Sequence, residues 1–264
     1  MTVVVKIGGA AGNDPSTLLE ELRDRDDCVL VHGGSDDADR LGARLGVEAR
    51  TFTSPTGVVS RRTDPAQLEV IVLALAGGVQ TRLVAALNAA GRPAVGLSGV
   101  DGRLVAARRK DGVREVVEGR VLRVTDDRSG TVESVDPRLL RLLLGSGYLP
   151  VVGPPALTPA GEVVNVDADR VAASVATALG ASDLVLLTNV PGLLRDPSDL
   201  ASRIPEVPRD EIEAVLPLAR GRMRKKVLAA QEALRGGVGR AVIAPADRPT
   251  PIAAALAGGG TTFR

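Results

Sequence analysis

The sequence predicts a three-layer α/β sandwich with a mainly parallel central sheet and an inserted β-hairpin region. Short apolar runs rich in Val and Leu alternate with helical stretches along most of the chain, which is the order of a parallel sheet covered by helices on both faces. Between residues 104 and 135 the pattern changes to short β-type segments. A chain of 264 residues is long enough for one such domain or two closely packed lobes.

The strands predicted for the main sheet are continuous apolar runs, of the kind that a parallel sheet buries on both faces. They cover residues 2–7, 28–31, 93–97, 149–152, 183–187 and 240–244. Several of the predicted helices open on Pro, or on Asp or Ser before Pro, and close on Gly. They cover residues 15–26, 36–46, 65–90, 137–145, 167–180, 208–216 and 221–235.

The middle of the chain predicts hairpins beside or over this sheet. Its β-type segments cover residues 104–109, 113–118, 121–125 and 130–135. The pairs Asp111-Gly112 and Glu118-Gly119 separate them and favour tight turns.

Composition disfavours several classes of protein. The formal net charge is +1 and aromatic residues make up 1% of the chain, so neither a basic field nor stacking platforms favour nucleic-acid binding. No stretch approaches eighteen consecutive apolar residues and we find no signal peptide, so we expect a cytoplasmic protein without a membrane span. The single cysteine, Cys28, cannot form an internal disulfide and is expected in the core.

Lysine is rare in this chain. The 33 basic residues include only four lysines: Lys6, Lys110, Lys225 and Lys226. Where Arg replaces Lys freely on the surface, a remaining Lys more often serves a site that needs a compact ammonium, such as a phosphate site.

Two glycine loops follow predicted strands. Lys6 ends the first strand before Gly8 and Gly9, and the second strand runs into a His-Gly-Gly loop with Gly33 and Gly34. Glycines at the end of a strand let backbone amides approach a phosphate, and a helix N-terminus favours an anion. Either loop alone could be a tight turn, but two of them favour phosphate binding.

Three further segments carry polar residues of interest. One of the adjacent arginines, Arg61, could pair with an acidic substrate or could be a solvated residue at a helix start. Asp169 could orient lysines and Asn165 could hold a substrate, whereas Asp167 is available as a helix cap. Lys226 leads the apolar face of the helix predicted at 221–235, where basic residues oppose the helix dipole and an anion would explain them.

Several known signatures are absent. The chain has no G-x-x-x-x-G-K-[ST], no G-x-G-x-x-G after the first strand, and neither His-Arg-Asp nor Asp-Phe-Gly, which removes P-loop enzymes, Rossmann dehydrogenases and protein kinases. His32 is the only histidine, so we expect it to hold its loop by a hydrogen bond, with no Ser-His machinery and no protein-built metal site.

Together, the Lys-x-Gly-Gly, His-Gly-Gly, Asn-x-Asp-x-Asp and Gly-x-Met-x-x-Lys segments resemble the amino-acid-kinase superfamily in order and spacing, over essentially the whole chain. The chain resembles acetylglutamate kinases, and more closely the related kinases of aminoadipate or glutamate attached to an amino-group carrier protein of the LysW type. The features that favour the carrier-linked relative are Ser35 after the two glycines and the segments 53–61 and 96–103. This resemblance implies ATP-dependent phosphorylation of a side-chain carboxylate, with Mg²⁺ carried on the ATP phosphates.

The resemblance also implies roles by position. Lys6 and Lys226 would stabilise the transferring phosphoryl group, and Asp169 would hold both lysines. The residues expected to bind the phosphoryl group and the acceptor are Gly33, Gly34, Arg61 and Asn165. The residues expected near the nucleotide are Gly8, Gly9, Thr188, Gly192 and Met223. The acceptor lobe would span about residues 1–180 and the nucleotide lobe about residues 181–264.

The carrier protein of that family is small and acidic, which would suit a basic hairpin edge. The residues expected to contact it are Arg103, Arg108, Arg109 and Lys110. Charges on a hairpin edge also discourage aggregation, so this alternative stays open. The family further implies a homodimer.

A carboxylate is already ionised at neutral pH, so its phosphorylation needs positioning and charge neutralisation rather than a general base. Three alternatives remain open at this point. The chain could phosphorylate free N-acetylglutamate, it could be a phosphatase with Asp167 as nucleophile, or it could be a sensor that binds a nucleotide or an amino acid without turnover.

Overall fold

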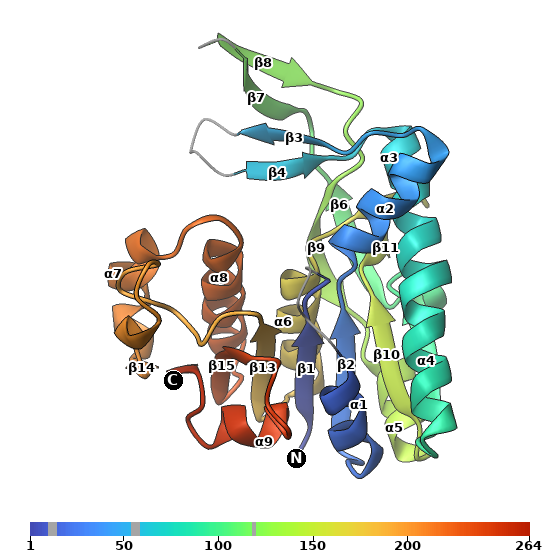
Figure 1. Ribbon diagram of the computed structural model, residues 1–264. Helices are drawn as coiled ribbons and strands as arrows, with labels where there is room; N and C mark the ends of the chain where they lie inside the picture. The colour runs from blue at the N-terminus through green and yellow to red at the C-terminus, as the bar shows by residue number, and fades with distance from the viewer. Residues whose placement is uncertain (10–14, 54–58, 118–119) are drawn as a thin grey trace.

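The computed structural model describes residues 1–9, 15–53, 59–117 and 120–264 (Figure 1). Its centre is a sheet in the order β14-β16-β15-β13-β1-β2-β10-β5. These strands are β1 (Val3–Ile7), β2 (Cys28–His32), β5 (Ala94–Ser98), β10 (Leu149–Gly153), β13 (Asp183–Thr188), β14 (Glu206–Val207), β15 (Arg240–Pro245) and β16 (Thr261–Phe263). Strand β16 runs antiparallel to β15, and the other pairs are parallel, which confirms a mainly parallel sheet.

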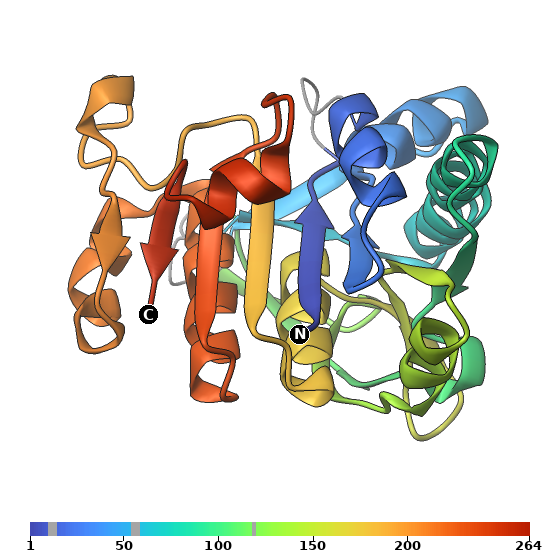
Figure 2. The same cartoon turned by 90° about the horizontal axis from the view of Figure 1, so that it is seen from below.

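Helices cover both faces of this sheet (Figure 2). One face carries α5 (Arg138–Gly145), α6 (Ala168–Leu179) and α8 (Gly221–Arg235), and the other carries α1 (Ser16–Arg23), α4 (Gln80–Ala89) and α9 (Pro251–Leu256). Strand β1 shows why both faces need a cover, because its apolar side chains point alternately to the two sides of the sheet. Val4 packs into the core under α5, α6 and α8, whereas Val3 and Val5 pack into the core under α1, α4 and α9. The predicted three-layer sandwich is confirmed.

The longest helix runs from Pro65 to Ala89 and joins α3 (Pro65–Val72), the π-helical segment η1 (Leu73–Val79) and α4. It begins where the Asp64 side chain accepts a hydrogen bond from the Gln67 amide. By length and composition it could cross a membrane, which the count of consecutive apolar residues did not indicate. Its α4 part packs on β5 and β10, so it belongs to the cover layer of the sheet while part of its apolar surface stays exposed.

The region between residues 104 and 135 differs in part from the prediction. Strand β6 (Val105–Arg109) pairs with β9 (Gly130–Val135) and with β11 (Pro155–Leu157), and β11 pairs with β12 (Val163–Asn165). The prediction of a hairpin around Asp111-Gly112 is therefore wrong, because β6 pairs with β9 and not with the next strand. Strands β7 (Val113–Val117) and β8 (Arg120–Val124) do form a hairpin, and its Glu118-Gly119 turn lies outside the described residues.

Two other departures come from short elements. Strands β3 (Arg50–Thr53) and β4 (Val59–Arg62) pair antiparallel in a region where the sequence predicted no strand, and residues 54–58 between them lie outside the described part. The helix predicted at 208–216 is split into the short helix α7 (Ile212–Val215) with 3-10 turns at Arg209–Glu211 and Leu216–Leu218. Both hairpins, β3–β4 and β7–β8, lie beyond the carboxyl ends of β1 and β2 (Figure 1).

Candidate active site

A cavity of about 740 Å³ lies at the carboxyl ends of β1, β2, β10 and β13. This is the edge where open parallel sheets bind their ligands. The predicted catalytic, acceptor and nucleotide residues that line it are Lys6, Gly8, Gly9, Gly33, Gly34, Arg61, Asn165, Asp169, Thr188, Gly192, Met223 and Lys226. The fold therefore brings together segments from both ends and the middle of the chain.

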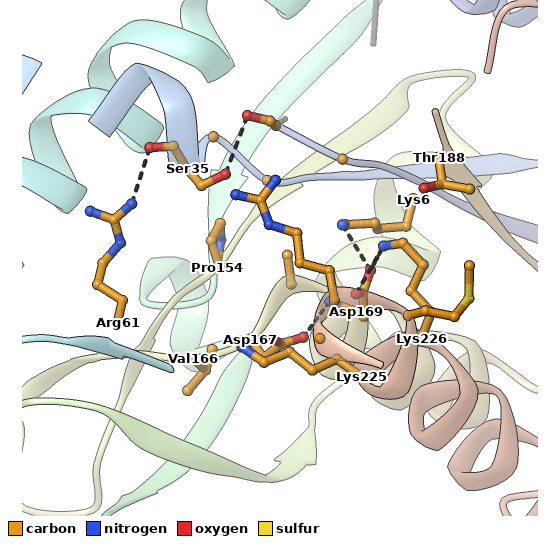
Figure 3. A pocket seen from close by; sticks show the side chains of 18 of the residues that line it. Lys6, Ser35, Arg61, Pro154, Val166, Asp167, Asp169, Thr188, Lys225 and Lys226 are labelled. Atoms are coloured by element: carbon orange, nitrogen blue, oxygen red, sulfur yellow. Dashed lines mark hydrogen bonds and ion pairs between the residues drawn. The ribbon is translucent and has the colours of Figure 1, made fainter. Parts of the chain in front are cut away.

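Lys6 and Lys226 share one carboxylate at the floor of this cavity (Figure 3). Lys6 Nζ lies 2.7 Å from Asp169 Oδ1, and Lys226 Nζ lies 3.2 Å from Oδ1 and 3.1 Å from Oδ2. All three side chains are at most 8% exposed. Two cations on one anion leave a net positive charge in a buried position, which suits a phosphoryl group.

Burial and charge act against each other in this cluster. Burial alone would raise the pKa of Asp169, but Lys6 and Lys226 hold the pKa of that carboxyl well below its ordinary value. Burial, together with repulsion by Lys6, lowers the pKa of Lys226, while Asp169 opposes this change. The carboxylate is therefore fixed as an anion between its two partners.

Local sequence explains how the cluster forms. Lys6 lies on the face of β1 that Val4 shares, and α6 and α8 cover that face. Asp167 caps α6 by accepting from the amides of Asp169 at 2.9 Å and Arg170 at 3.4 Å. Lys225 Nζ lies 3.4 Å from Asp167 Oδ2, so two successive lysines of α8 pair with the two aspartates that begin α6.

The two glycine loops pack directly on each other. A Cβ on Gly9 would lie 2.2 Å from the Gly34 nitrogen, so only glycine fits there. The Gly33 amide donates to the Ile7 carbonyl at 3.0 Å and is therefore occupied within the protein. Ser35 Oγ donates to the Gly9 carbonyl at 3.3 Å, and α2 (Ser35–Leu45) begins here with Asp36 and Asp37 in its first turn.

The acceptor side is built from β4, β12 and α2. Arg61 forms an ion pair with Asp39, with its Nη1 at 2.6 Å from Oδ1, and its Nη2 donates to the Ser35 carbonyl at 3.2 Å. Asn165 Nδ2 donates to Thr63 Oγ1 at 3.3 Å. Asp39 also lines the cavity and was not indicated by the sequence, because a helical aspartate without a motif resembles any exposed acidic residue.

A buried carboxylate, Asp127, stabilises the acceptor side by accepting hydrogen bonds from two backbone amides. Its Oδ2 accepts from the Thr63 amide at 2.9 Å and its Oδ1 accepts from the Ser129 amide at 2.7 Å. It is 1% exposed and does not line the cavity. Sequence reasoning missed this residue, since no motif marks it and its partner Thr63 lies far away along the chain.

The opposite end of the cavity is formed by the loops after β13 and before α8. Thr188 ends β13 and is buried, and Met223 lies in the first turn of α8. Gly192 has φ of 147° and a Cβ there would lie 2.5 Å from Thr261 Oγ1, so this tight approach requires glycine. Arg220 and Arg222 also line this end and were not among the predicted site residues.

The basic residues of the predicted hairpin edge have different environments. Lys110 is exposed and lines the cavity. Arg108 pairs with Glu133 at 3.1 Å, and Arg109 donates to the carbonyls of Asp127 at 2.9 Å and Thr125 at 3.0 Å. Arg103 is exposed and has φ of 56°. Only Lys110 of these four residues belongs to the cavity.

Comparison with known proteins agrees with the family resemblance that the motifs indicate. The sequence model of the amino acid kinase family matches residues 1–245. The chain is 48% identical to a [LysW]-aminoadipate kinase of Deinococcus radiodurans, covering 98% of this chain and 90% of that one. It is 46% identical to a [LysW]-aminoadipate kinase of Thermus thermophilus, covering 99% and 100%. Among solved structures, N-acetylglutamate synthase of Neisseria gonorrhoeae aligns with a TM-score of 0.76 at 27% identity, over 99% of this chain and 59% of that one.

Proposed function

Because this chain belongs to the amino acid kinase family, we propose that it uses ATP to phosphorylate the side-chain carboxylate of aminoadipate, or of glutamate, linked to an amino-group carrier protein. An oxygen of the acceptor carboxylate attacks the γ-phosphorus, the bond from phosphorus to the β–γ bridging oxygen breaks, and ADP leaves. The products are an acyl phosphate and ADP, and no proton has to be removed from the acceptor.

The single observation that carries this proposal is the buried Lys6–Asp169–Lys226 cluster, at the floor of a cavity that two glycine loops border. The two ammonium groups would neutralise the negative charge that spreads over the transferring phosphoryl oxygens. Gly34 would add a backbone donor. Asp169 would hold both lysines in place before the nucleotide arrives.

We assign the two ends of the cavity to the two substrates. Arg61 and Asn165 would bind the acceptor, in a lobe of about residues 1–180. Thr188, Gly192 and Met223, with Gly8 and Gly9, would contact the nucleotide, in a lobe that begins near residue 181. Among the described residues there is no group of three His, Cys, Asp or Glu side chains that could hold a metal. Mg²⁺ would be carried on the ATP phosphates, as the family resemblance implies.

The relatives' names support an acidic carrier as the partner that delivers the acceptor. Lys110 at the cavity and the exposed Arg103 are the residues of the basic hairpin edge that are best placed to meet it. Arg108 and Arg109 would contribute less, because each already has partners within the chain. Binding that weakens steeply with salt is the expected outcome for such a contact.

We further propose that the protein works as a homodimer in the cytoplasm. The helix Pro65–Ala89 exposes part of an apolar surface, including Leu73, which is 50% exposed. A second copy covering this surface would remove it from water. Light scattering measures the molar mass, which should be that of a dimer for the wild type and of a monomer for Leu73→Glu. Sedimentation with vesicles tests the alternative that a membrane covers the helix.

Hydroxylamine trapping of the acyl phosphate tests the central proposal. The assay compares carrier-linked aminoadipate, carrier-linked glutamate and free N-acetylglutamate, with the wild type and Lys226→Ala. Hydroxamate from a carrier-linked acceptor, lost in Lys226→Ala, is the expected result. Hydroxamate from free N-acetylglutamate alone would assign the chain to that acceptor instead, and none from any acceptor would overturn the carboxylate-kinase proposal.

A further inference from the structure

We infer that His32 and Gln80 aim the Gly34 amide at the phosphoryl-binding end of the cavity, and that the two are positioning residues for the transfer step. The inference rests on the proposed function, since it assumes that this amide meets the transferring phosphoryl group. His32 is fully buried at the end of β2 and does not line the cavity. It therefore acts through its loop and not on a substrate.

The first step is the hydrogen bond from the ring to the loop. His32 Nδ1 lies 2.9 Å from the Gly33 carbonyl oxygen, and since a carbonyl only accepts, Nδ1 carries the ring proton. The Gly33 amide donates to the Ile7 carbonyl at 3.0 Å. Gly33 is therefore held on one side by β1 and on the other side by the histidine ring.

The second step follows from the planarity of the peptide bond. The Gly33 carbonyl and the Gly34 N–H belong to one trans peptide unit and point in opposite directions. A hydrogen bond that holds the carbonyl therefore also sets the direction of the Gly34 N–H. Gly34 lines the cavity, and no described residue accepts a hydrogen bond from its amide. This amide is a donor kept for a ligand.

The third step concerns the other ring nitrogen. With the proton on Nδ1, Nε2 needs a donor, and the Gln80 amide lies 3.4 Å from it. The Gln80 amide satisfies the backbone of Leu97 when its nitrogen donates to the Leu97 carbonyl at 2.9 Å and its oxygen accepts from the Leu97 amide at 3.0 Å. In that orientation the amide nitrogen also faces His32 Nε2, so Leu97 fixes Gln80 and Gln80 fixes the ring.

The surrounding strands leave room for this pair. A Cβ on Gly96 would lie 2.7 Å from the Gln80 amide, and a Cβ on Gly153 would lie 3.2 Å from His32 Nε2. Two polar side chains in an apolar layer are costly unless they are paired, so such a network specifies one arrangement of the groups it holds. The π-helical segment η1 ends one residue before Gln80, and its Val79 would meet a Cβ on Gly34 at 3.0 Å.

The experiment compares two substitutions of the ring. His32→Asn keeps an N–H donor close to the position of Nδ1, whereas His32→Leu keeps the volume and removes the donor. We expect His32→Leu to lower kcat by about 10- to 100-fold, which is less than the loss of a complete oxyanion donor, with little change in the KM of either substrate. His32→Asn should retain kcat within about threefold of the wild type. Gln80→Met should lower kcat by roughly threefold to tenfold, because the ring loses the group that sets its orientation.

Val29→Ala is the matched control, because Val29 is a fully buried residue of the same strand that packs into the core on the other face of the sheet. It should lower Tm and leave kcat unchanged. A folded His32→Leu with wild-type kcat would overturn the inference, and so would equal losses of kcat in His32→Asn and His32→Leu. If His32→Leu does not fold, a folded Gln80→Met with wild-type kcat would overturn the inference, and so would a loss of kcat in His32→Asn as large as that expected for His32→Leu. A wild type that forms no hydroxamate would instead overturn the proposed function, so the two failures are distinguishable.

Discussion

Lys6 and Lys226 come from opposite ends of the chain and place their ammonium nitrogens at 2.7 and 3.1 Å from the carboxylate of one residue, Asp169. Neither lysine could lie so close to the other without this anion, because two buried like charges repel strongly. The carboxylate therefore does two things at once. It stabilises the packing of β1, α6 and α8, and it prepares a positive site for a phosphoryl group.

The two adjacent lysines of α8 should differ sharply in their importance. Lys226→Ala removes a buried ammonium from the cluster, so we expect kcat to fall by about 10²- to 10³-fold. Lys225 is 34% exposed and pairs with Asp167 at the longer distance of 3.4 Å, so Lys225→Ala should lower kcat by less than about tenfold. Steady-state kinetics with a saturating acceptor measures both values. Equal losses would contradict a special role for the cluster.

Asp169→Asn should destabilise the fold as well as the activity. The substitution leaves two ammonium groups buried without their anion, which typically costs about 3–5 kcal/mol in the free energy of unfolding. Urea denaturation followed by circular dichroism measures this loss. Asp26→Asn is the control, because Asp26 is 92% exposed in its pair with Arg92 and should change the stability by less than about 1 kcal/mol.

Gly9→Ala should abolish activity, whereas Gly46→Ala should not. A Cβ on Gly9 would collide with the backbone of Gly34 at 2.2 Å and force the two glycine loops apart. Gly46 ends α2 with φ of 72° and has open space around it, so alanine there costs only about 1–2 kcal/mol of backbone strain. Comparing kcat and Tm of both variants separates damage to the site from a general loss of stability. Wild-type kcat in Gly9→Ala would contradict the packing of the loops.

The buried histidine predicts a loss of stability in mild acid. Burial lowers the pKa of His32 below its ordinary value of 6.5, and the nearby Lys6 lowers it further. The unfolded chain therefore takes up a proton near pH 6.5 that the folded chain refuses, so the free energy of unfolding should fall as the pH drops below about 6.5. His32→Asn cannot take up this proton. Its stability should decline less than that of the wild type between pH 7 and pH 5 in parallel urea titrations.

Much of this architecture could be predicted from local sequence. Strands β1, β2 and β13 were predicted within one residue at each end, because a continuous apolar run between helices can be buried only in the middle of a sheet. Helix α8 was predicted at its observed bounds, from Gly221 to Arg235. The short strands β11 and β12 were missed, since three residues carry too little pattern to distinguish a strand from a loop.

The partner of each strand was harder to predict than the strand itself. Strand β6 was expected to form a hairpin with the next β segment, yet it pairs with β9 and leaves β7 and β8 to pair with each other. Hairpin turns favour neighbours in sequence, but in the observed pairing with β9 the β6 side chains of Val105 and Ala107 are fully buried.

The sequence by itself determined the alternation of strands and helices, the positions of the glycine loops and the identity of Lys6, Asp169 and Lys226 as residues of interest, because these features depend on local pattern and on motif spacing. The family resemblance also implied that Asp169 holds both lysines. Only the tertiary structure decided the distances and burial of that cluster, the pairing of Asp39 with Arg61 and the contact of Gln80 with His32. These contacts join side chains that lie far apart along the chain, and their geometry depends on how the layers pack. Packing of that kind leaves no periodic signal in the sequence.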